Sequence, residues 1–217
     1  MGDKKLIVLG AGIVGFLIAF YLVFYFREVM DKGFEESPVV KESEKKMHDY
    51  EKWVEYNSKL THFRARFPEA PQTDAQAISI AGKDSTKAAL NVFVSEMPDQ
   101  STLMIKVTRF PDDYQVKNVK FQLDETMNAI LNANKQNVLR DYLETTWQGH
   151  KALNFEVQNE TIRILAKSIF ANNAIYTLIY AATIGNYDAK IFENFLEGFV
   201  ITTDFKAPKK TVSFLRT

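Results

Sequence analysis

The chain has 217 residues, of which 27 are lysine or arginine and 27 are aspartate or glutamate, so its formal net charge is zero. A zero net charge argues against a nucleic-acid binder that works by neutralising phosphates. The absence of cysteine excludes disulfides, thiol catalysis and zinc sites built on thiolates. With 46 % apolar residues the chain has the composition of a folded protein rather than a disordered one.

The first 30 residues predict a transmembrane anchor. No charged residue occurs from Leu6 to Phe26, and a helix over this run is about 31 Å long, close to the hydrocarbon thickness of a bilayer. The run is longer than the apolar core of a cleaved signal peptide. Lys4 and Lys5 precede it and favour an N-terminus inside the cell, which places the domain of this single-pass protein on the non-cytoplasmic side.

Small residues within the predicted anchor allow two interpretations. Ala11, Gly15 and Ala19 are spaced four apart and share one helix face, where they let a second membrane helix approach closely. Alternatively, Gly10, Gly12 and Gly15 fit the G-x-G-x-x-G pattern of an oxidoreductase that binds FAD or NAD. The all-apolar run after the glycines, and a charged segment where a second strand should follow, count against the dinucleotide alternative.

Residues 31–50 are mostly charged and predict a solvated spacer between the bilayer and a folded domain over residues 51–204. The first half of that domain is expected to contain strands. Phe63 to Phe67 alternates apolar and polar residues, as a half-buried strand does. Further strands are predicted over residues 77–80, 90–95 and 103–110.

The second half of the domain mixes helices with strands. We predict a helix over residues 123–139 with Asp124 as its N-cap, then strands over residues 143–147 and 151–157. Two apolar runs, 161–170 and 174–184, predict a hairpin that turns at Asn172 and Asn173. Asp188 caps a last helix that ends at Gly198, and residues 199–201 form a short strand. The order predicts an α+β fold, an antiparallel sheet flanked by helices.

A pattern of residues along the domain, many of them aromatic, proline or glycine, resembles that of a known family. They are Trp53, Tyr56, Ser58, Phe63, Ala65, Phe67, Pro68 and Pro71, then Leu123, Asp124 and Gly149, the run Ala174 to Leu178, and Phe192, Phe195, Leu196 and Phe199. Over residues 53 to 203 this pattern resembles the PsbP-like α/β/α sandwich group, which includes the bacterial DcrB-like proteins. The resemblance implies an antiparallel sandwich, often anchored outside the cytoplasm, with an accessory or binding role. It brings no catalytic motif.

Residues that could carry chemistry are few, and we assign no catalytic, cofactor or metal site. His48, His62 and His150 lack metal-ligand spacing, and Asp99 fits a turn better than a cation site. The aromatic residues between Trp53 and Phe67 are expected to be core anchors. The basic tail, residues 205–217, is a candidate partner-docking segment; its candidate contact residues are Lys209, Lys210, Val212 and Phe214.

These observations predict a membrane-anchored, non-enzymatic binding or accessory module. It is expected to be a subunit or assembly factor of a membrane protein complex, with the lipid bilayer and other subunits as partners, and no nucleic acid or cofactor. Two alternatives stay open, namely the oxidoreductase that uses the Gly10–Gly15 motif and an anchored domain that binds a small ligand.

Overall fold

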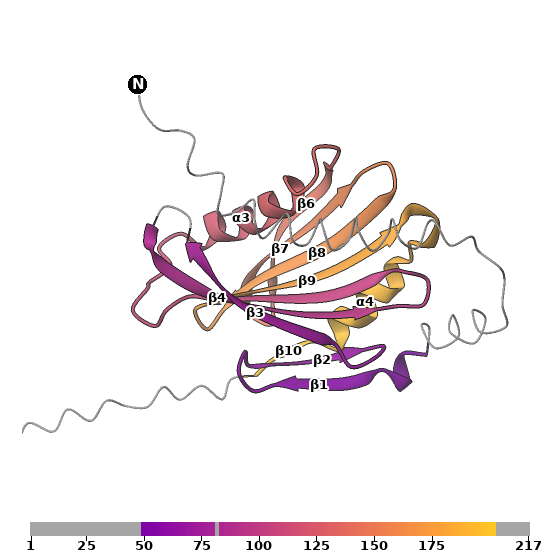
Figure 1. The fold of residues 1–217 in the computed structure, drawn as a ribbon, viewed down its shortest axis with the longest axis horizontal. Coiled ribbons are helices and arrows are strands. Elements are labelled where there is room, and N and C mark those ends of the chain that lie inside the picture. Colours follow the sequence, from indigo (N-terminus) through magenta and orange to yellow (C-terminus); the bar gives the residue numbers. More distant parts are fainter. Residues whose placement is uncertain (1–48, 81–82, 203–217) are drawn as a thin grey trace, which may run out of the picture.

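The computed structural model describes residues 49–80 and 83–202. These residues form two antiparallel sheets with helices packed against them (Figure 1). The large sheet has the strand order β3-β4-β5-β9-β8-β7-β6, and the small sheet has the order β1-β2-β10. All the strand pairs of both sheets are antiparallel. The predicted α+β fold with an antiparallel sheet is therefore confirmed. A Rossmann domain needs a parallel sheet, so the described domain does not supply what the dinucleotide alternative requires.

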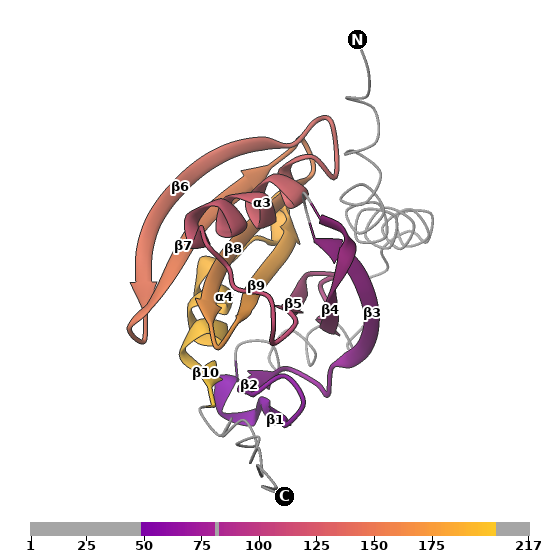
Figure 2. The same cartoon turned by 90° about the vertical axis from the view of Figure 1, so that its left-hand side faces the viewer.

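The elements follow the chain from the small sheet to the large one and back. The strands are β1 (Val54–Ser58), β2 (Phe63–Phe67), β3 (Gln72–Ile80), β4 (Lys83–Glu96), β5 (Thr102–Arg109), β6 (Val138–Trp147), β7 (His150–Gln158), β8 (Ile162–Ala171), β9 (Ala174–Thr183) and β10 (Val200–Ile201). The helices are the short 3₁₀ turns η1 (Tyr50–Lys52) and η2 (Ile184–Asn186) and the α-helices α3 (Val119–Leu131) and α4 (Ala189–Glu197). Figure 2 shows β3 and β6 at the two ends of the large sheet and the small sheet below them.

The first hydrophobic core lies between the large sheet, the small sheet and α4. Strand β2 alternates as the sequence predicted, with Phe63, Ala65 and Phe67 buried and the two arginines between them exposed. The ring of Phe67 packs against that of Phe195 on α4, with 5.3 Å between the ring centroids. Trp53, Phe63 and Phe67 are thus core residues, as expected.

The second core lies on the opposite face of the large sheet, beneath α3. This helix buries Leu123, Met127 and Ile130 against strands β7 and β8. On β5, the side chain of Met104 belongs to this core, while the neighbouring Leu103 and Ile105 belong to the first one. Because successive side chains of a strand point to opposite faces, the two helices cover the two faces of the same sheet.

The predicted helix over 123–139 is wrong at both ends. It begins at Val119, and Asn118 rather than Asp124 caps it, accepting a hydrogen bond from the Phe121 N–H at 3.1 Å. It ends at Leu131 because asparagine side chains there bond to nearby backbone instead of continuing the helix. Asn137 Nδ2 donates to the Ile130 carbonyl at 3.0 Å, and the next residue already belongs to β6.

Other strand boundaries also differ from the prediction. Strands β3 and β4 extend well beyond the predicted ranges 77–80 and 90–95, and β6 begins five residues before the predicted start at 143. Strand β1 has no counterpart in the prediction. Strands β1, β3 and β6 are mostly exposed, so the alternation of apolar and polar residues that marks a half-buried strand is weak in them.

Several local predictions are confirmed. Asn172 and Asn173 turn the β8–β9 hairpin with positive φ angles of 51° and 56°. Asp188 caps α4 by accepting from the Lys190 N–H at 2.9 Å, and Gly198 is the C-cap of that helix. The short last strand, β10, pairs with β2.

The two hairpin asparagines allow a matched test. Asn173→Gly should lower the free energy of unfolding by about 1–3 kcal/mol, because glycine keeps the positive φ but removes an amide that donates to the Pro111 carbonyl at 2.9 Å and the Tyr114 carbonyl at 3.2 Å. Asn172→Gly is the control, and it should change stability by only a few tenths of a kcal/mol. Urea denaturation compares the two variants. Equal losses would mean that the amide does not hold the loop after β5.

Part of the sequence prediction lies outside the described residues. This part comprises the anchor over Leu6 to Phe26, the helix-packing residues Ala11, Gly15 and Ala19, the glycines Gly10 and Gly12, and the tail residues Lys209, Lys210, Val212 and Phe214. Within residues 49–80 and 83–202, no helix is long and apolar enough to span a bilayer. The anchor, its orientation and the tail therefore remain predictions.

Candidate functional site

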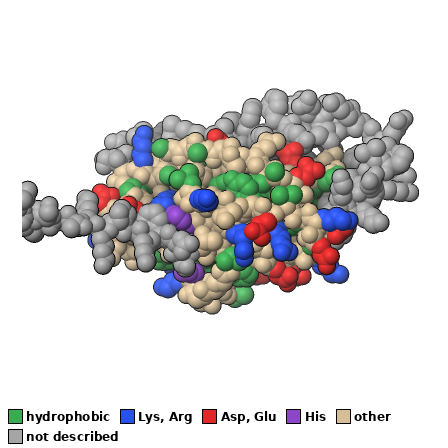
Figure 3. Space-filling model, turned by 90° about the horizontal axis from the view of Figure 1, so that it is seen from below, with side chains coloured by type: hydrophobic (Ala, Val, Ile, Leu, Met, Phe, Trp, Pro, Cys, Tyr) green, Lys and Arg blue, Asp and Glu red, His purple; other side chains and the backbone are tan. Residues whose placement is uncertain are grey.

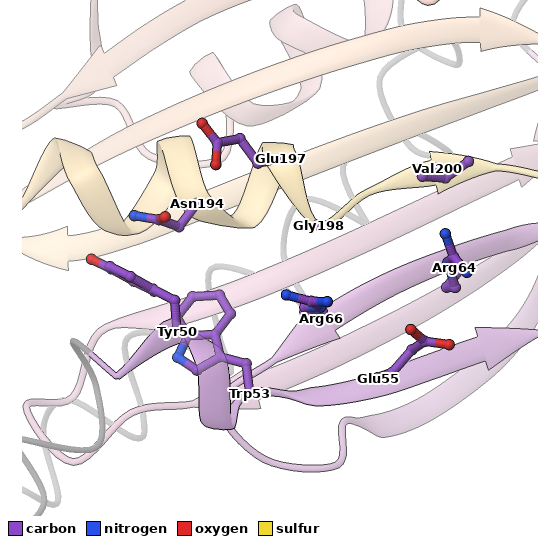
Figure 4. A pocket seen from close by; sticks show the side chains of 9 residues that line it. All are labelled: Tyr50, Trp53, Glu55, Arg64, Arg66, Asn194, Glu197, Gly198 and Val200. Atoms are coloured by element: carbon purple, nitrogen blue, oxygen red, sulfur yellow. The ribbon is translucent and has the colours of Figure 1, made fainter.

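A surface cavity of about 260 Å³ lies between the outer face of the small sheet and the end of α4 (Figure 4). Strand β2 contributes Arg64 and Arg66, β1 contributes Glu55, and the last turn of α4 contributes Asn194 and Glu197. The aromatic residues Tyr50 and Trp53 lie at one end of the cavity, and Val200 lies at the other. We call this cavity the Arg64–Arg66 pocket.

The two arginines reach the pocket because of the alternation in β2. Phe63, Ala65 and Phe67 point into the first core, so Arg64 and Arg66 share the opposite, exposed face of the strand. Among the described residues, neither guanidinium has an ion-pair or hydrogen-bond partner. A pair of arginines on one strand face with all their N–H donors unused is a common way to recognise an anion.

Two carboxylates balance the charge of the arginines. Glu55 lies directly opposite Arg66 in the β1–β2 register, and Glu197 lies in the last turn of α4. Neither carboxylate forms an ion pair within the described part of the chain. Figure 4 shows Glu55 on the strand next to both arginines. The pocket therefore presents two positive and two negative charges that do not neutralise one another through direct contact.

An aromatic pair closes one end of the pocket. The rings of Tyr50 and Trp53 meet edge to face with 5.2 Å between centroids. Trp53 is 6 % exposed, and its Nε1–H is buried without a hydrogen-bond partner among the described residues. Burial, and to a lesser degree the carboxylate of Asp188, raises the pKa of Tyr50, so its hydroxyl is neutral at physiological pH.

Gly198 sets the distance between α4 and β2. A Cβ atom added at this position would lie 3.1 Å from Cβ of Arg66 and 3.4 Å from the Arg66 backbone nitrogen. Its N–H closes the helix by donating to the Asn194 carbonyl at 3.1 Å. Glycine is needed here for close approach and not for its backbone conformation, since its φ of −74° is open to any residue.

Substitution of Gly198 should therefore disturb the pocket. Gly198→Ala should cost about 1 kcal/mol of stability, because the new methyl group pushes against the backbone of β2, which cannot easily move away. The control is Gly185→Ala, where no atom lies within 4 Å of the added Cβ. Thermal unfolding of the two variants measures the difference. A loss in both variants, or in neither, would contradict the close approach.

Other polar residues considered in the sequence have structural positions. Asp99 accepts from the Ser101 N–H at 2.9 Å and the Ser101 hydroxyl at 2.6 Å, which confirms its role in a turn. His62 precedes β2 with a positive φ of 56°, and its carbonyl accepts from the Thr202 N–H. Within residues 49–80 and 83–202, no three histidine or acidic side chains come together in a way that could hold a metal ion.

The sequence patterns do not predict this pocket. In the sequence, Arg64 and Arg66 are the polar positions of a predicted strand, and no pattern distinguishes Glu55 or Glu197 from other surface charges. The one available signal was that both outward positions of β2 carry the same charge. That signal cannot reveal Glu197, which lies more than 130 residues further along the chain.

Comparisons with known proteins find similar chains among the solved structures. No family model matches the chain, and no curated protein matches it. A solution structure of cyanobacterial PsbP (CyanoP) from Synechocystis sp. PCC 6803 is 13 % identical with a TM-score of 0.46, over 68 % of this chain and 91 % of that one. A protein of unknown function from Pseudomonas aeruginosa, PA94, described as a putative regulator, is 13 % identical with a TM-score of 0.31, over 62 % and 85 %. These structures are what the chain is similar to, and neither similarity assigns a family or a function.

Proposed function

We propose that this chain is a non-enzymatic, membrane-anchored binding module that acts as an accessory subunit or assembly factor of a membrane protein complex. The observation that carries the proposal is the Arg64–Arg66 pocket, in which four charged side chains of the described domain face solvent without ion-pair partners. Charged groups that are accessible and unpaired can exchange water for a ligand or partner at little cost, whereas a structural ion pair would have to break first.

The position of the pocket supports the same proposal. Tyr50 lines the pocket and is the last residue of the charged spacer, so the chain enters the domain at this point. The 22 residues from Arg27 to His48 span about 75 Å when fully extended and about 26 Å as a flexible coil. With Leu6 to Phe26 in the bilayer, the pocket is held within reach of the membrane surface and of the exposed segments of neighbouring membrane proteins.

A detergent pull-down from native membranes tests the proposal. The full-length protein should bring down specific membrane partners, and a variant that begins at Lys41 shows whether the predicted anchor is needed to hold them. The double variant Arg64→Gln, Arg66→Gln should lose partners that the double variant Arg140→Gln, Lys151→Gln keeps, since both remove two positive charges from exposed positions. Failure of the full-length protein to retain any partner would reject the accessory role.

A further inference from the structure

We infer that the Arg64–Arg66 pocket binds a zwitterion that carries a phosphate diester and an ammonium group, the chemistry of a phosphoethanolamine headgroup. The inference deepens the proposed binding function and rests on it for the choice of this pocket. It follows from three features of the site, which are the paired guanidiniums, the paired carboxylates beside an aromatic wall, and the volume.

The guanidinium groups form the half of the site that binds the anion. Arg64 and Arg66 lie two residues apart on one face of β2, so their Cα atoms are roughly 6.5–7 Å apart. Two guanidinium forks at this spacing can converge on one anion and offer it four or more N–H donors. The two oxygens of a carboxylate lie in one plane and suit a single fork, whereas the two charged oxygens of a phosphate diester are arranged tetrahedrally, so each can accept from a different guanidinium. A phosphate therefore uses this pair of arginines better than a carboxylate does.

The carboxylates form the half of the site that binds the cation. Glu55 lies opposite Arg66, and Glu197 faces the same cavity from α4. A ligand with only negative charge would bring its charge close to both carboxylates, and this repulsion would offset part of the gain from the arginines. An ammonium group a few ångströms from the phosphate turns that repulsion into attraction. The half-buried ring of Tyr50, held edge to face against the buried Trp53, adds an aromatic surface at the end of the pocket that attracts cations.

The surface around the pocket has the same mixed character. Figure 3 views the molecule from below, the side on which the small sheet lies in Figure 1, and shows basic and acidic side chains interleaved there beside a hydrophobic stripe. Neither sign of charge forms a broad patch of the kind that attracts a polyanion. The cavity of about 260 Å³ is also smaller than the pockets of roughly 300–1,000 Å³ that hold drug-sized ligands. It suits a headgroup rather than a whole lipid or a long peptide.

Calorimetric titration of the full chain in a maltoside detergent tests the inference. The probe is glycerophosphoethanolamine, which carries the diester and the ammonium. Glycerophosphoglycerol carries the same diester without the ammonium, and ethanolamine carries the ammonium alone. Glycerophosphoethanolamine should bind at least tenfold more tightly than either of the other two. Equal affinity for the two diesters, or no binding heat with any probe, would overturn the inference.

Variants assign each half of the ligand to its residues. The double variant Arg64→Gln, Arg66→Gln should lose binding of both diesters. The double variant Glu55→Gln, Glu197→Gln should bind glycerophosphoethanolamine no better than glycerophosphoglycerol. The double variant Arg140→Gln, Lys151→Gln, at exposed positions of β6 and β7, should bind like the unmodified protein. Unchanged binding by the Arg64, Arg66 variant would show that the probe binds elsewhere.

A vesicle experiment distinguishes a membrane lipid from a free ligand. The full chain is reconstituted into vesicles of phosphatidylethanolamine mixed with phosphatidylglycerol, or of phosphatidylglycerol alone. If lipid headgroups occupy the pocket, the soluble probe should bind at least tenfold more weakly in the first vesicles than in the second. Equal binding identifies a free zwitterion as the ligand. A pull-down that succeeds while the calorimetry fails removes only the ligand class, and the reverse result removes only the protein partners.

Discussion

Replacement of Lys106 with methionine should raise the free energy of unfolding at pH 7 by about 3 kcal/mol. Lys106 lies on β5 in the middle of the large sheet and is only 6 % exposed. Its cross-strand neighbours, Val92 and Thr177, carry no charge. Burial alone lowers the pKa of Lys106 from 10.5 to about 8, so folding at pH 7 has to desolvate a charged ammonium group. A shift of this size corresponds to about 3 kcal/mol, and methionine avoids the cost while filling similar space.

The buried ammonium group of Lys106 should also be visible in the pH dependence of stability. Because the folded-state pKa is lowered, the unfolded chain binds a proton between about pH 8 and pH 10.5 that the folded chain does not. The stability of the unmodified protein should therefore rise with pH across this window. Burial raises the pKa of Tyr176 and of Tyr180 to about 12. Above about pH 10 the unfolded chain loses these two protons while the folded chain keeps them, so the free energy of unfolding falls only in that higher range. Measurements from pH 7 to pH 9.5 therefore report the ionisation of the buried lysines Lys106 and Lys167 rather than that of these tyrosines.

Urea denaturation of three proteins makes this test. The unmodified chain should gain stability between pH 7 and pH 9.5, and Lys106→Met should gain much less. Part of the gain should remain in Lys106→Met, because burial also lowers the pKa of Lys167. Lys87→Met, at an exposed position of the adjacent strand β4, is the control and should follow the unmodified protein. A Lys106→Met variant that is less stable than the unmodified protein at pH 7 would mean that the ammonium group has a favourable partner.

The sequence predicted the parts of the fold whose side chains are buried on one face or fixed in a turn. The alternation from Phe63 to Phe67 is visible because one face of β2 packs into the core. Asn172, Asn173 and Asp188 are recognisable because each satisfies a local backbone requirement, a positive φ or a free helix N–H. These signals lie within a few residues of one another, so they can be found without knowing the tertiary structure.

The parts of the fold and of the pocket that the sequence does not predict depend on contacts between distant segments. Strand β3 exposes most of its side chains and is held by pairing with β4, which a periodic pattern in one segment cannot reveal. The pocket depends even more on distant contacts, because the β1–β2 hairpin supplies three of its charges and α4 supplies the fourth. In the sequence each of these side chains is an ordinary surface charge. The β1–β2 pairing brings Glu55 beside the arginines, and the packing of α4 against β2 adds Glu197.

The packing of α4 against β2 should depend strongly on Phe195. This side chain is fully buried, and its ring packs against Phe67 on β2. Phe195→Ala removes most of the ring and leaves a cavity in the first core, so the free energy of unfolding should fall by about 4 kcal/mol. For a domain of this size the unfolding temperature should drop by roughly 10 °C. Phe121→Ala on α3 is the control, because Phe121 is 46 % exposed, and its loss should stay below about 1 kcal/mol.

The same variant connects the core to the pocket. Glu197 follows Phe195 by two residues on α4, so a loosened helix no longer holds this carboxylate opposite the arginines of β2. At a temperature where Phe195→Ala is still folded, glycerophosphoethanolamine should lose its advantage over glycerophosphoglycerol, while Phe121→Ala should keep it. Thermal scans followed by calorimetry measure both effects on the same samples. Full preference for the zwitterion in a folded but destabilised Phe195→Ala would mean that the pocket does not depend on how α4 is packed, and that the arginines and Glu55 suffice for recognition.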